Sequence, residues 1–472
     1  MAPGAGADAV LAAPRLLQGA FAGVGDFYVF LLSRRLFGAR AARWALACQI
    51  MSWFNFFCAP RTLANSAEAV LSLAALYHWP KFGEAGPCTL GEEPGGSLAL
   101  TLGMLACVVR PPAAPMWLAV GVWELTRRRR PWRWLRVRVL PVAVLVGTGS
   151  VLLDSWAYWR VGADARGGLP LLPERGAWEW VVAPWNFLRF NVLEGGSANY
   201  GTHPLHWYFT QGFPVVAGTL LPVMALGAYR NWRRGAWLIV LALWCVCYHS
   251  LLAHKEFRFV LLPLQLLMPH CGAYLSSLGW DLIAYAKKGV ASPRSRSTAW
   301  RAAIVVAIFA PQVLAAAYFS FVHQRGGLDV LHTLRLEAEA GSVNGVLFLT
   351  PCHTTPFYSH MHWDVPMSFL DCSPHLQGSP AEAYEMEQDA FTTNPVSFLR
   401  SRFASERGEP QNPALPSHIV LFDEQVPKVR PFLESEGYEL AHVAFHAHMP
   451  ADAEYESSGR AQVVVFTKPA ND

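Results

Sequence analysis

The stretch LIVLALWCVCYHSLLAHKEFRFVLLPLQLLMPHCGAYLSSL, residues 238–278, consists of two apolar runs separated by the six residues HKEFRF at 254–259. A helix that spans a bilayer needs about 20 mainly apolar residues, and each run approaches that length. Charged side chains are costly inside a membrane and are rare there unless they have a function. This stretch therefore predicts two membrane helices joined by a short charged connector.

The whole chain has the composition of a polytopic membrane protein. It has 472 residues, of which 53% are hydrophobic and only 15% are charged, and its mean hydropathy is +0.23. A soluble protein of this length is less apolar. The net charge is only +4, and the Lys and Arg residues lie in short connectors and not along one face. Nucleic acid is therefore excluded as a partner.

Ten segments have the length and polarity expected of membrane helices. They are residues 10–33, 42–58, 62–79, 96–110, 112–126, 139–158, 207–229, 235–253, 257–284 and 302–322. The two that meet at Pro111 and Pro112 could form one kinked helix or a hairpin. The first 17 residues lack the basic start of a signal peptide, so nothing indicates cleavage.

Basic residues in the connectors predict the orientation of these segments, because Lys and Arg are retained on the cytoplasmic side of a membrane. The four most basic connectors fall on one side if every segment crosses: residues 33–43, 127–138, 230–234 and 287–301. HKEFRF, the N-terminus and everything after Phe321 fall on the other side. A basic cluster on that lumenal side opposes the usual bias and indicates an anionic ligand.

From about residue 323 the sequence becomes mixed and polar, and it is long enough for one folded domain. Three β-rich runs occur there: GVLFLT at 345–350, HIVLFD at 418–423 and AQVVVFT at 461–467. Their spacing predicts a small α/β domain at 323–472, after a membrane domain at 1–322.

Most of the nine cysteines lie inside apolar runs, where they are expected to be small buried hydrophobes. Cys352 and Cys372 lie in the polar C-terminal region and could form a disulfide if that region is in an oxidising compartment. The same region contains a group of possible metal ligands: His353, His360, His362, Asp364 and Asp371. They complete no recognised metal-binding spacing, so a polar loop is favoured and no metal is predicted.

HKEFRF carries four polar side chains, those of His254, Lys255, Glu256 and Arg258. One interpretation is an interfacial cluster with an internal ion pair to Glu256. The other is a phosphate site, because guanidinium, ammonium and imidazole groups all donate hydrogen bonds to phosphate oxygens. The predicted lumenal placement favours the phosphate site.

A second polar set lies in FFCAPRTLANSAEAVL, where Arg61, Asn65 and Glu68 are spaced to share one helix face. These side chains could join neighbouring helices or line a cavity.

The connector NVLEGGSANYGTHPLHWYFTQGFP, residues 191–214, is rich in aromatic and hydrogen-bonding side chains: Asn199, Tyr200, His203, His206, Trp207, Tyr208 and Gln211. Aromatic residues at a membrane boundary commonly form an interface belt. The Asn, His and Gln groups are also those that bind a sugar or head group by directional hydrogen bonds. His203 and His206 alone make only a weak case for a metal.

Together these motifs resemble the GT-C membrane glycosyltransferases that use dolichol-phosphate mannose in the endoplasmic reticulum lumen. HKEFRF, RTLANSAE, HPLHWYFTQGFP, PCHTTPFYSHMH, MSFLDCSP and PSHIVLFDE are most similar to the GPI mannosyltransferases that add the third, α1,2-linked mannose. The resemblance covers essentially the whole chain. It implies a multi-pass protein of the endoplasmic reticulum membrane with a GT-C helix bundle and a lumenal C-terminal α/β domain.

The resemblance also implies roles for the polar residues. Donor phosphate would be bound by His254, Lys255, Arg258 and Arg61, with Glu256, Glu68 and Asn65 orienting those cations. The sugar or acceptor would lie against Asn199, Tyr200, His203, His206, Trp207 and Gln211. The cations could replace a metal at the leaving phosphate, so no cofactor is expected beyond the lipid-linked donor and a glycolipid acceptor.

One family feature has no counterpart in this sequence. The family carries a helix and an acidic His-Pro-Asp-Glu loop ahead of the segment that resembles APRLLQGAFAGVGDFY, residues 13–28, and this chain begins near that segment. We therefore expect a shortened chain whose catalytic base is unassigned. Alternatives are an N-glycan-type dolichol-linked mannosyltransferase, a catalytically impaired scaffold, and, as a different class, a lipid transporter or scramblase.

Overall fold

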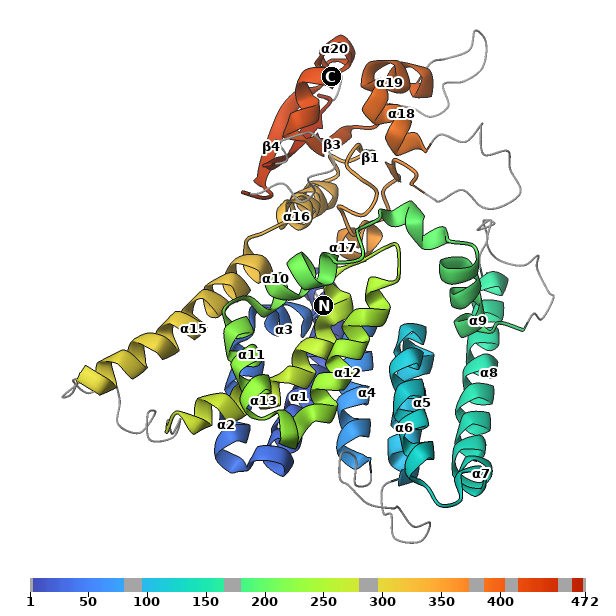
Figure 1. The fold of residues 1–472 in the computed structure, drawn as a ribbon. Helices are drawn as coiled ribbons and strands as arrows, with labels where there is room; N and C mark the ends of the chain where they lie inside the picture. The colour runs from blue at the N-terminus through green and yellow to red at the C-terminus, as the bar shows by residue number, and fades with distance from the viewer. Residues whose placement is uncertain are drawn as a thin grey trace. The chain divides into compact units, whose positions relative to one another are not determined.

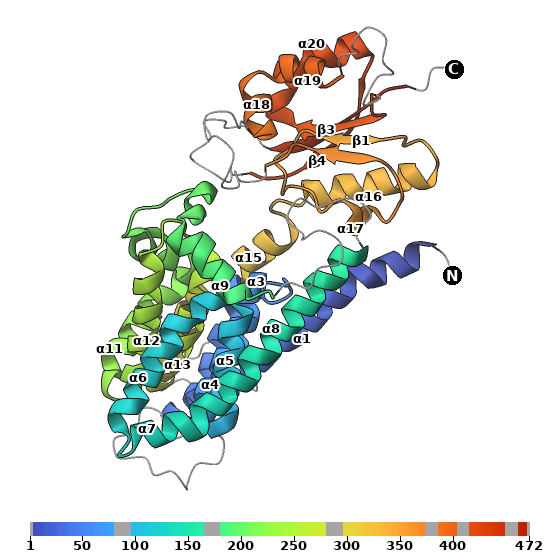
Figure 2. The same cartoon turned by 90° about the vertical axis from the view of Figure 1, so that its right-hand side faces the viewer.

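The computed structural model describes residues 3–79, 96–164, 180–279, 296–372, 386–403, 415–448 and 461–469. The chain divides into two compact units, one formed by Pro14–Ala316 and the other by Met1–Ala13 with Ala317–Asp472. The first is a bundle of helices, and the second contains a β-sheet (Figures 1 and 2).

The helical unit contains long helices interrupted by short turns. The helices are α1 Pro3–Phe37, which begins in the other unit, α2 Ala39–Met51, α3 Trp53–Cys58, α4 Ala64–His78, α5 Gly96–Val109, α6 Ala114–Arg127, α7 Pro131–Trp134, α8 Leu140–Asp164, α9 Ala183–Leu188, α10 Phe213–Ala217, α11 Leu221–Arg230, α12 Trp232–Ser250, α13 Leu261–Ser277 and α15 Arg296–Phe321. Short 3-10 or π turns are η1 Pro111–Ala113, η2 Leu135–Val139, η3 Arg189–Leu193, η4 Gly196–Tyr200, η5 Tyr208–Gly212, η6 Gly218–Leu220 and η7 Phe257–Val260.

In the described residues, five stretches are long and apolar enough to cross a membrane. They are Asp8–Phe37, Pro131–Arg160, Tyr208–Arg230, Phe257–Ser277 and Trp300–Glu339. Each overlaps one of the ten predicted segments. Other predicted segments correspond to shorter helices such as α5. Its 14 residues extend only about 21 Å, whereas the hydrocarbon core of a bilayer is about 30 Å thick. The membrane character is therefore clear, and the number ten remains a prediction.

Two alternatives left open at Pro111 and Pro112 are decided by the structure. Helix α5 ends at Val109, the turn η1 holds the two prolines, and α6 begins at Ala114. Proline lacks the N–H that would continue the α5 hydrogen bonds, so the chain forms two helices and not one kinked helix.

Helix α13 forms the centre of the bundle, and 13 of its 17 residues are buried. It packs against α2, α4, α11 and α12. Gly272 of α13 faces backbone atoms of Ala41 and Ala45 in α2, where any Cβ would collide. Small residues at such a crossing allow two membrane helices to approach closely.

The other unit contains a five-stranded sheet in the order β2-β1-β3-β5-β4. Strands β1 Val346–Phe348, β2 Met367–Phe369 and β3 His418–Phe422 are parallel, whereas β5 Gln462–Thr467 and β4 Glu439–Phe445 extend the sheet antiparallel. The remaining elements are helices α16 Gly326–Glu339, α17 Tyr358–Met361, α18 Glu387–Thr393, α19 Pro395–Phe403 and α20 Val426–Glu436, and the turn η8 Asp423–Gln425. The three expected strands are present. Two further strands were not expected from the sequence: β2 has only three residues, and none of the seven residues of β4 is buried.

Helices cover both faces of this sheet. Val346 and Phe348 of β1 pack with α16, whereas Leu347 packs with α18, α19 and α20 on the opposite face. Alternate side chains of a strand point to opposite faces, so two apolar layers form from one short run. Both layers are visible in Figure 2.

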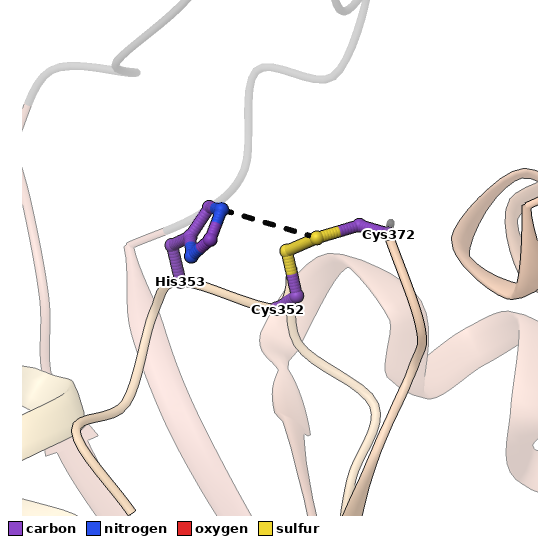
Figure 3. Close-up of side chains that lie close together, drawn as sticks. All are labelled: Cys352, His353 and Cys372. Atoms are coloured by element: carbon purple, nitrogen blue, oxygen red, sulfur yellow. Dashed lines mark hydrogen bonds between the residues drawn. A yellow bond between two sulfur atoms is a disulfide. The ribbon is translucent and has the colours of Figure 1, made fainter. Parts of the chain in front are cut away.

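Cys352 and Cys372 form a disulfide with a Cα–Cα distance of 6.2 Å. The ring Nε2 of His353 lies 3.9 Å from the Sγ of Cys372 (Figure 3). These three are the only group in the described residues that meets the geometry of a metal cluster. Because the two sulfurs are bonded to each other, neither is a thiolate that could bind a metal ion. His360, His362, Asp364 and Asp371 belong to no such group in the described part of the chain.

Candidate cation site at the end of the helix bundle

HKEFRF lies between the C-terminal end of α12 and the start of α13. Glu256 is extended, and the turn η7 begins at Phe257 and leads into α13. This places a buried Lys255 and an exposed Arg258 three residues apart, with 4% of Lys255 and 43% of the Arg258 side chain accessible. The motif therefore has one buried cation, Lys255, and one exposed cation, Arg258.

Lys255 holds the 201–208 connector against the motif. Its Nζ donates hydrogen bonds to the carbonyl oxygens of His203, at 2.8 Å, and Leu252, at 2.5 Å. The His203 N–H donates to the Ala253 carbonyl at 3.1 Å. Burial lowers the pKa of Lys255, because it disfavours the charged form. Lys255 is therefore placed to position the connector, and it reaches an outer ligand less readily than Arg258.

Tyr208 forms a second link between the connector and the motif. Its hydroxyl donates to the Glu256 carbonyl at 3.0 Å and accepts from the Glu256 N–H at 3.1 Å. Tyr208 is fully buried. Tyr208 belongs to the polar connector expected from the sequence but was not among the expected sugar or acceptor residues.

Other residues of the connector divide into packed and exposed groups. Trp207 is buried, and its ring lies 4.7 Å from that of His203 and 5.0 Å from that of Phe257. Tyr200, His206 and Gln211 are exposed. Trp207 and His203 thus support the site by packing, whereas the exposed three can meet a ligand. The side chain of Asn199 lies outside the described structure.

Glu256 is shared between two cations. Its Oε1 accepts hydrogen bonds from Arg258 at 2.5 Å and from the Nε2 of His254 at 3.1 Å. His254 Nδ1 also donates to the Gly201 carbonyl at 3.2 Å. The hydrogen bond to Glu256 raises the pKa of His254 against the effect of burial. Burial alone would raise the pKa of Glu256, but the bonds from His254 and Arg258 lower it. Two side chains, those of Arg258 and His254, therefore share one carboxylate, while Lys255 is held by backbone carbonyl oxygens.

Of two predicted neighbours from the N-terminal half, Asn65 contacts this cluster and Arg61 packs against Phe57 of α3. Asn65 of α4 donates to the carbonyl oxygen of Arg258 at 3.2 Å. Arg61 lies over the ring of Phe57 at 3.4 Å and donates to the Phe57 carbonyl. Both Arg61 and Arg258 act electrostatically on the Cys58 thiol, so their charges lie in the same part of the helical unit.

Glu68 corrects one part of the expected site. It does not orient the cations of HKEFRF, because its Oε2 accepts from Arg110 at 2.6 Å and both side chains are buried. The packing of α4 against α5 causes this pairing, since Arg110 follows the last residue of α5. Arg110 also lies 4.9 Å from the ring of Phe259. The sequence contains one indication that Arg110 has a partner: it is a lone Arg at the end of the apolar run 96–110.

The arrangement of the helices is similar to that of solved membrane proteins. The crystal structure of ArnT from Cupriavidus metallidurans bound to undecaprenyl phosphate superposes with a TM-score of 0.55 at 15% identity, covering 97% of this chain and 84% of that chain. ArnT in the apo state gives a TM-score of 0.53 at 14% identity, with the same coverage. The fold is therefore that of the GT-C membrane glycosyltransferases.

Sequence comparison narrows this class. The profile of the Alg9-like mannosyltransferase family matches residues 5–362, and the chain belongs to that family. It is 36% identical to mannosyltransferase APTG1 of Arabidopsis thaliana over 97% of this chain and 78% of that protein. It is 33% identical to GPI alpha-1,2-mannosyltransferase 3 of Danio rerio and 32% to that of Homo sapiens, over 93% of this chain and 72% and 70% of those proteins. The family expected from the motifs is confirmed.

Proposed function

We propose that this protein transfers an α1,2-linked mannose, the third, from dolichol-phosphate mannose to a GPI-anchor precursor. The names of the relatives from fish and human support the linkage and the pathway. The reaction joins an acceptor hydroxyl to the anomeric carbon of mannose while the bond to the lipid phosphate breaks. Such a reaction needs a base for the hydroxyl and positive charge for the departing phosphate.

The observation that carries this proposal is that Arg258 and His254 share the single carboxylate of Glu256. Arg258 uses one nitrogen on Glu256 and is half exposed, so its remaining N–H groups can bind phosphate oxygens. His254 shares Glu256 with Arg258, and the charge of Arg61 acts on the same Cys58 thiol as that of Arg258. Lys255 positions the connector, and Asn65 positions the Arg258 backbone. These fixed cations would neutralise the leaving phosphate without a metal.

The sugar and acceptor would meet the exposed side of the connector. Tyr200, His206 and Gln211 offer a ring face, an imidazole and an amide, which suit hexose hydroxyls and ring C–H groups. The residue that accepts the hydroxyl proton is unassigned.

A lumenal location for this chemistry is supported by the Cys352–Cys372 disulfide. Structural disulfides persist in oxidising compartments such as the endoplasmic reticulum lumen. The basic connectors predict the same side for the C-terminal region and for HKEFRF.

The test uses cells that do not add the third GPI mannose, into which the gene of this protein is introduced. Arg258→Ala is expected to abolish recovery of surface GPI-anchored proteins, measured by flow cytometry, because the phosphate loses its guanidinium. Lys255→Ala is expected to do the same by releasing the connector.

Arg189→Ala is the matched control. Arg189 forms a similar exposed pair with Glu194, at 2.6 Å, in the same unit. It should restore surface GPI proteins to the wild-type level at equal protein amount. Full recovery with Arg258→Ala would exclude the phosphate role. In separate cells that lack an N-glycan dolichol-linked mannosyltransferase, recovery of N-glycan mannosylation by this protein would favour the N-glycan-type alternative.

A further inference from the structure

A separate polar cavity lies inside the helical unit. It has a volume of about 90 Å³ and is lined by α1, α2, α3, α4 and α13. These helices lie together in Figure 1. The lining includes five polar side chains, those of Asp26, Gln49, Asn55, Ser66 and Gln265. None of them was among the expected site residues.

Four of these side chains form one directed chain of hydrogen bonds. Gln265 Nε2 donates to Asn55 Oδ1 at 3.2 Å, Asn55 Nδ2 donates to Gln49 Oε1 at 3.0 Å, and Gln49 Nε2 donates to Asp26 Oδ1 at 2.9 Å. The chain of hydrogen bonds therefore ends on a carboxylate and joins four helices, α13, α3, α2 and α1. Polar groups at membrane depth are costly, and they commonly mark a functional pathway.

The other end of the chain has an unused acceptor. Gln265 is 9% exposed, and its buried Oε1 has no hydrogen-bond partner among the described residues. Buried polar atoms in native structures are nearly always paired, so an orphan atom in a polar cavity indicates a missing partner. A donor such as a hydroxyl would satisfy it.

The cavity adjoins the cation cluster. Ser66 follows Asn65, which contacts the Arg258 backbone. Leu261 and Gln265, both in the lining, come three and seven residues after Arg258 on the way into α13. Seven residues of helix extend about 10 Å, which is of the order of a hexose joined to a phosphate.

We propose that this cavity binds the hydroxyl groups at one edge of a hexopyranose carried by a lipid-linked substrate. Amide and carboxylate oxygens accept from sugar hydroxyls, and the Ser66 hydroxyl can both donate and accept. The volume equals that of about three waters, which suits one edge of a sugar and not a whole ring. The assignment rests on the proposed mannosyl transfer, and the hexose belongs to either the donor or the acceptor.

The experiment measures binding to the purified protein by isothermal titration calorimetry. The probes are a short-chain polyprenyl phosphate mannose, the same polyprenyl phosphate without sugar, and a soluble dimannosyl GPI head group. The variants are Asp26→Asn, which keeps the side-chain shape, and Gln265→Leu. Gln312→Leu is the control, because Gln312 is a buried glutamine of the same unit that bonds Trp53 and Ala217 outside the cavity.

Asp26→Asn and Gln265→Leu are expected to weaken the binding of one mannose-bearing probe about 10-fold, the scale of one lost hydrogen bond to a charged or buried group. Binding of the sugar-free phosphate should stay at the wild-type value, as should all binding by Gln312→Leu. Weakening of the polyprenyl phosphate mannose alone assigns the donor sugar, and weakening of the GPI head group alone assigns the acceptor.

Unchanged binding of all three probes would overturn the proposal and leave a cavity that holds only ordered water. Equal weakening of the sugar-free phosphate would also overturn it, because the effect would then be global. If the wild-type protein binds neither mannose-bearing probe, the assignment of a sugar site to the cavity is wrong. If it binds them but transfers no mannose, the proposed reaction fails and the cavity assignment stands.

Discussion

Removing Arg110 is expected to destabilise the helical unit strongly, because Glu68 would be left as an unpaired buried carboxylate. The two side chains are 8% and 4% exposed and meet at 2.6 Å. Breaking a buried ion pair from one side typically costs about 3–5 kcal/mol, whereas replacing both partners by apolar residues of similar volume is often neutral. We therefore expect Arg110→Met to lower the free energy of unfolding by about 3–5 kcal/mol.

The matched double variant Glu68→Leu with Arg110→Met tests whether the loss comes from the unpaired charge. For a unit of this size, 3–5 kcal/mol corresponds to a fall in Tm of about 5–8 °C. The assay is thermal unfolding of the purified protein followed by tryptophan fluorescence. The double variant should recover most of the loss in Tm. An Arg110→Met protein as stable as wild type, or a double variant with the summed losses of both single changes, would refute the reasoning.

The same pair should also affect activity. Arg110 lies over the Phe259 ring, and Phe259 belongs to η7, which carries Arg258. The double variant loses this cation–π contact, worth about 2 kcal/mol when it is desolvated, even when stability returns. We therefore expect it to remain less active than wild type in the GPI complementation assay. Full activity would show that the contact with Phe259 does not position Arg258.

Two further results are expected. The raised pKa of His254, caused by its hydrogen bond to Glu256, means that this histidine stabilises the fold fully below its unfolded pKa of about 6.5 and loses that contribution as pH rises through the folded value. The Tm difference between wild type and His254→Gln should therefore shrink from pH 6 to pH 9, and a constant difference would contradict this. Joint replacement of Cys352 and Cys372 by Ala should remove about 3 kcal/mol of stability, from the entropy of a loop of 20 residues. Cys247→Ala, at an exposed free cysteine, should leave Tm unchanged, and a disulfide variant equal to this control would disprove the estimate.

Local patterns in the sequence were sufficient for the class of protein and for the position of its charged connector. Charge is costly to bury in lipid, so membrane helices are apolar runs and their connectors are basic. Both patterns are formed by residues that are adjacent in the sequence. The strands at 345–350, 418–423 and 461–467 were recognisable for the same reason, since a run buried on both faces is apolar along its whole length. The motifs were also enough to indicate the family.

Tertiary structure alone decided which polar groups meet. Glu68 and Arg110 are 42 residues apart, Lys255 and His203 are 52 apart, and Gln265 and Asn55 are 210 apart. Which helices pack side by side is set by small residues such as Gly272 against Ala41 and Ala45, and no local period reveals it. Hence the sequence located the cations of HKEFRF, but only the packing showed that Lys255 positions a connector while Arg258 faces outward.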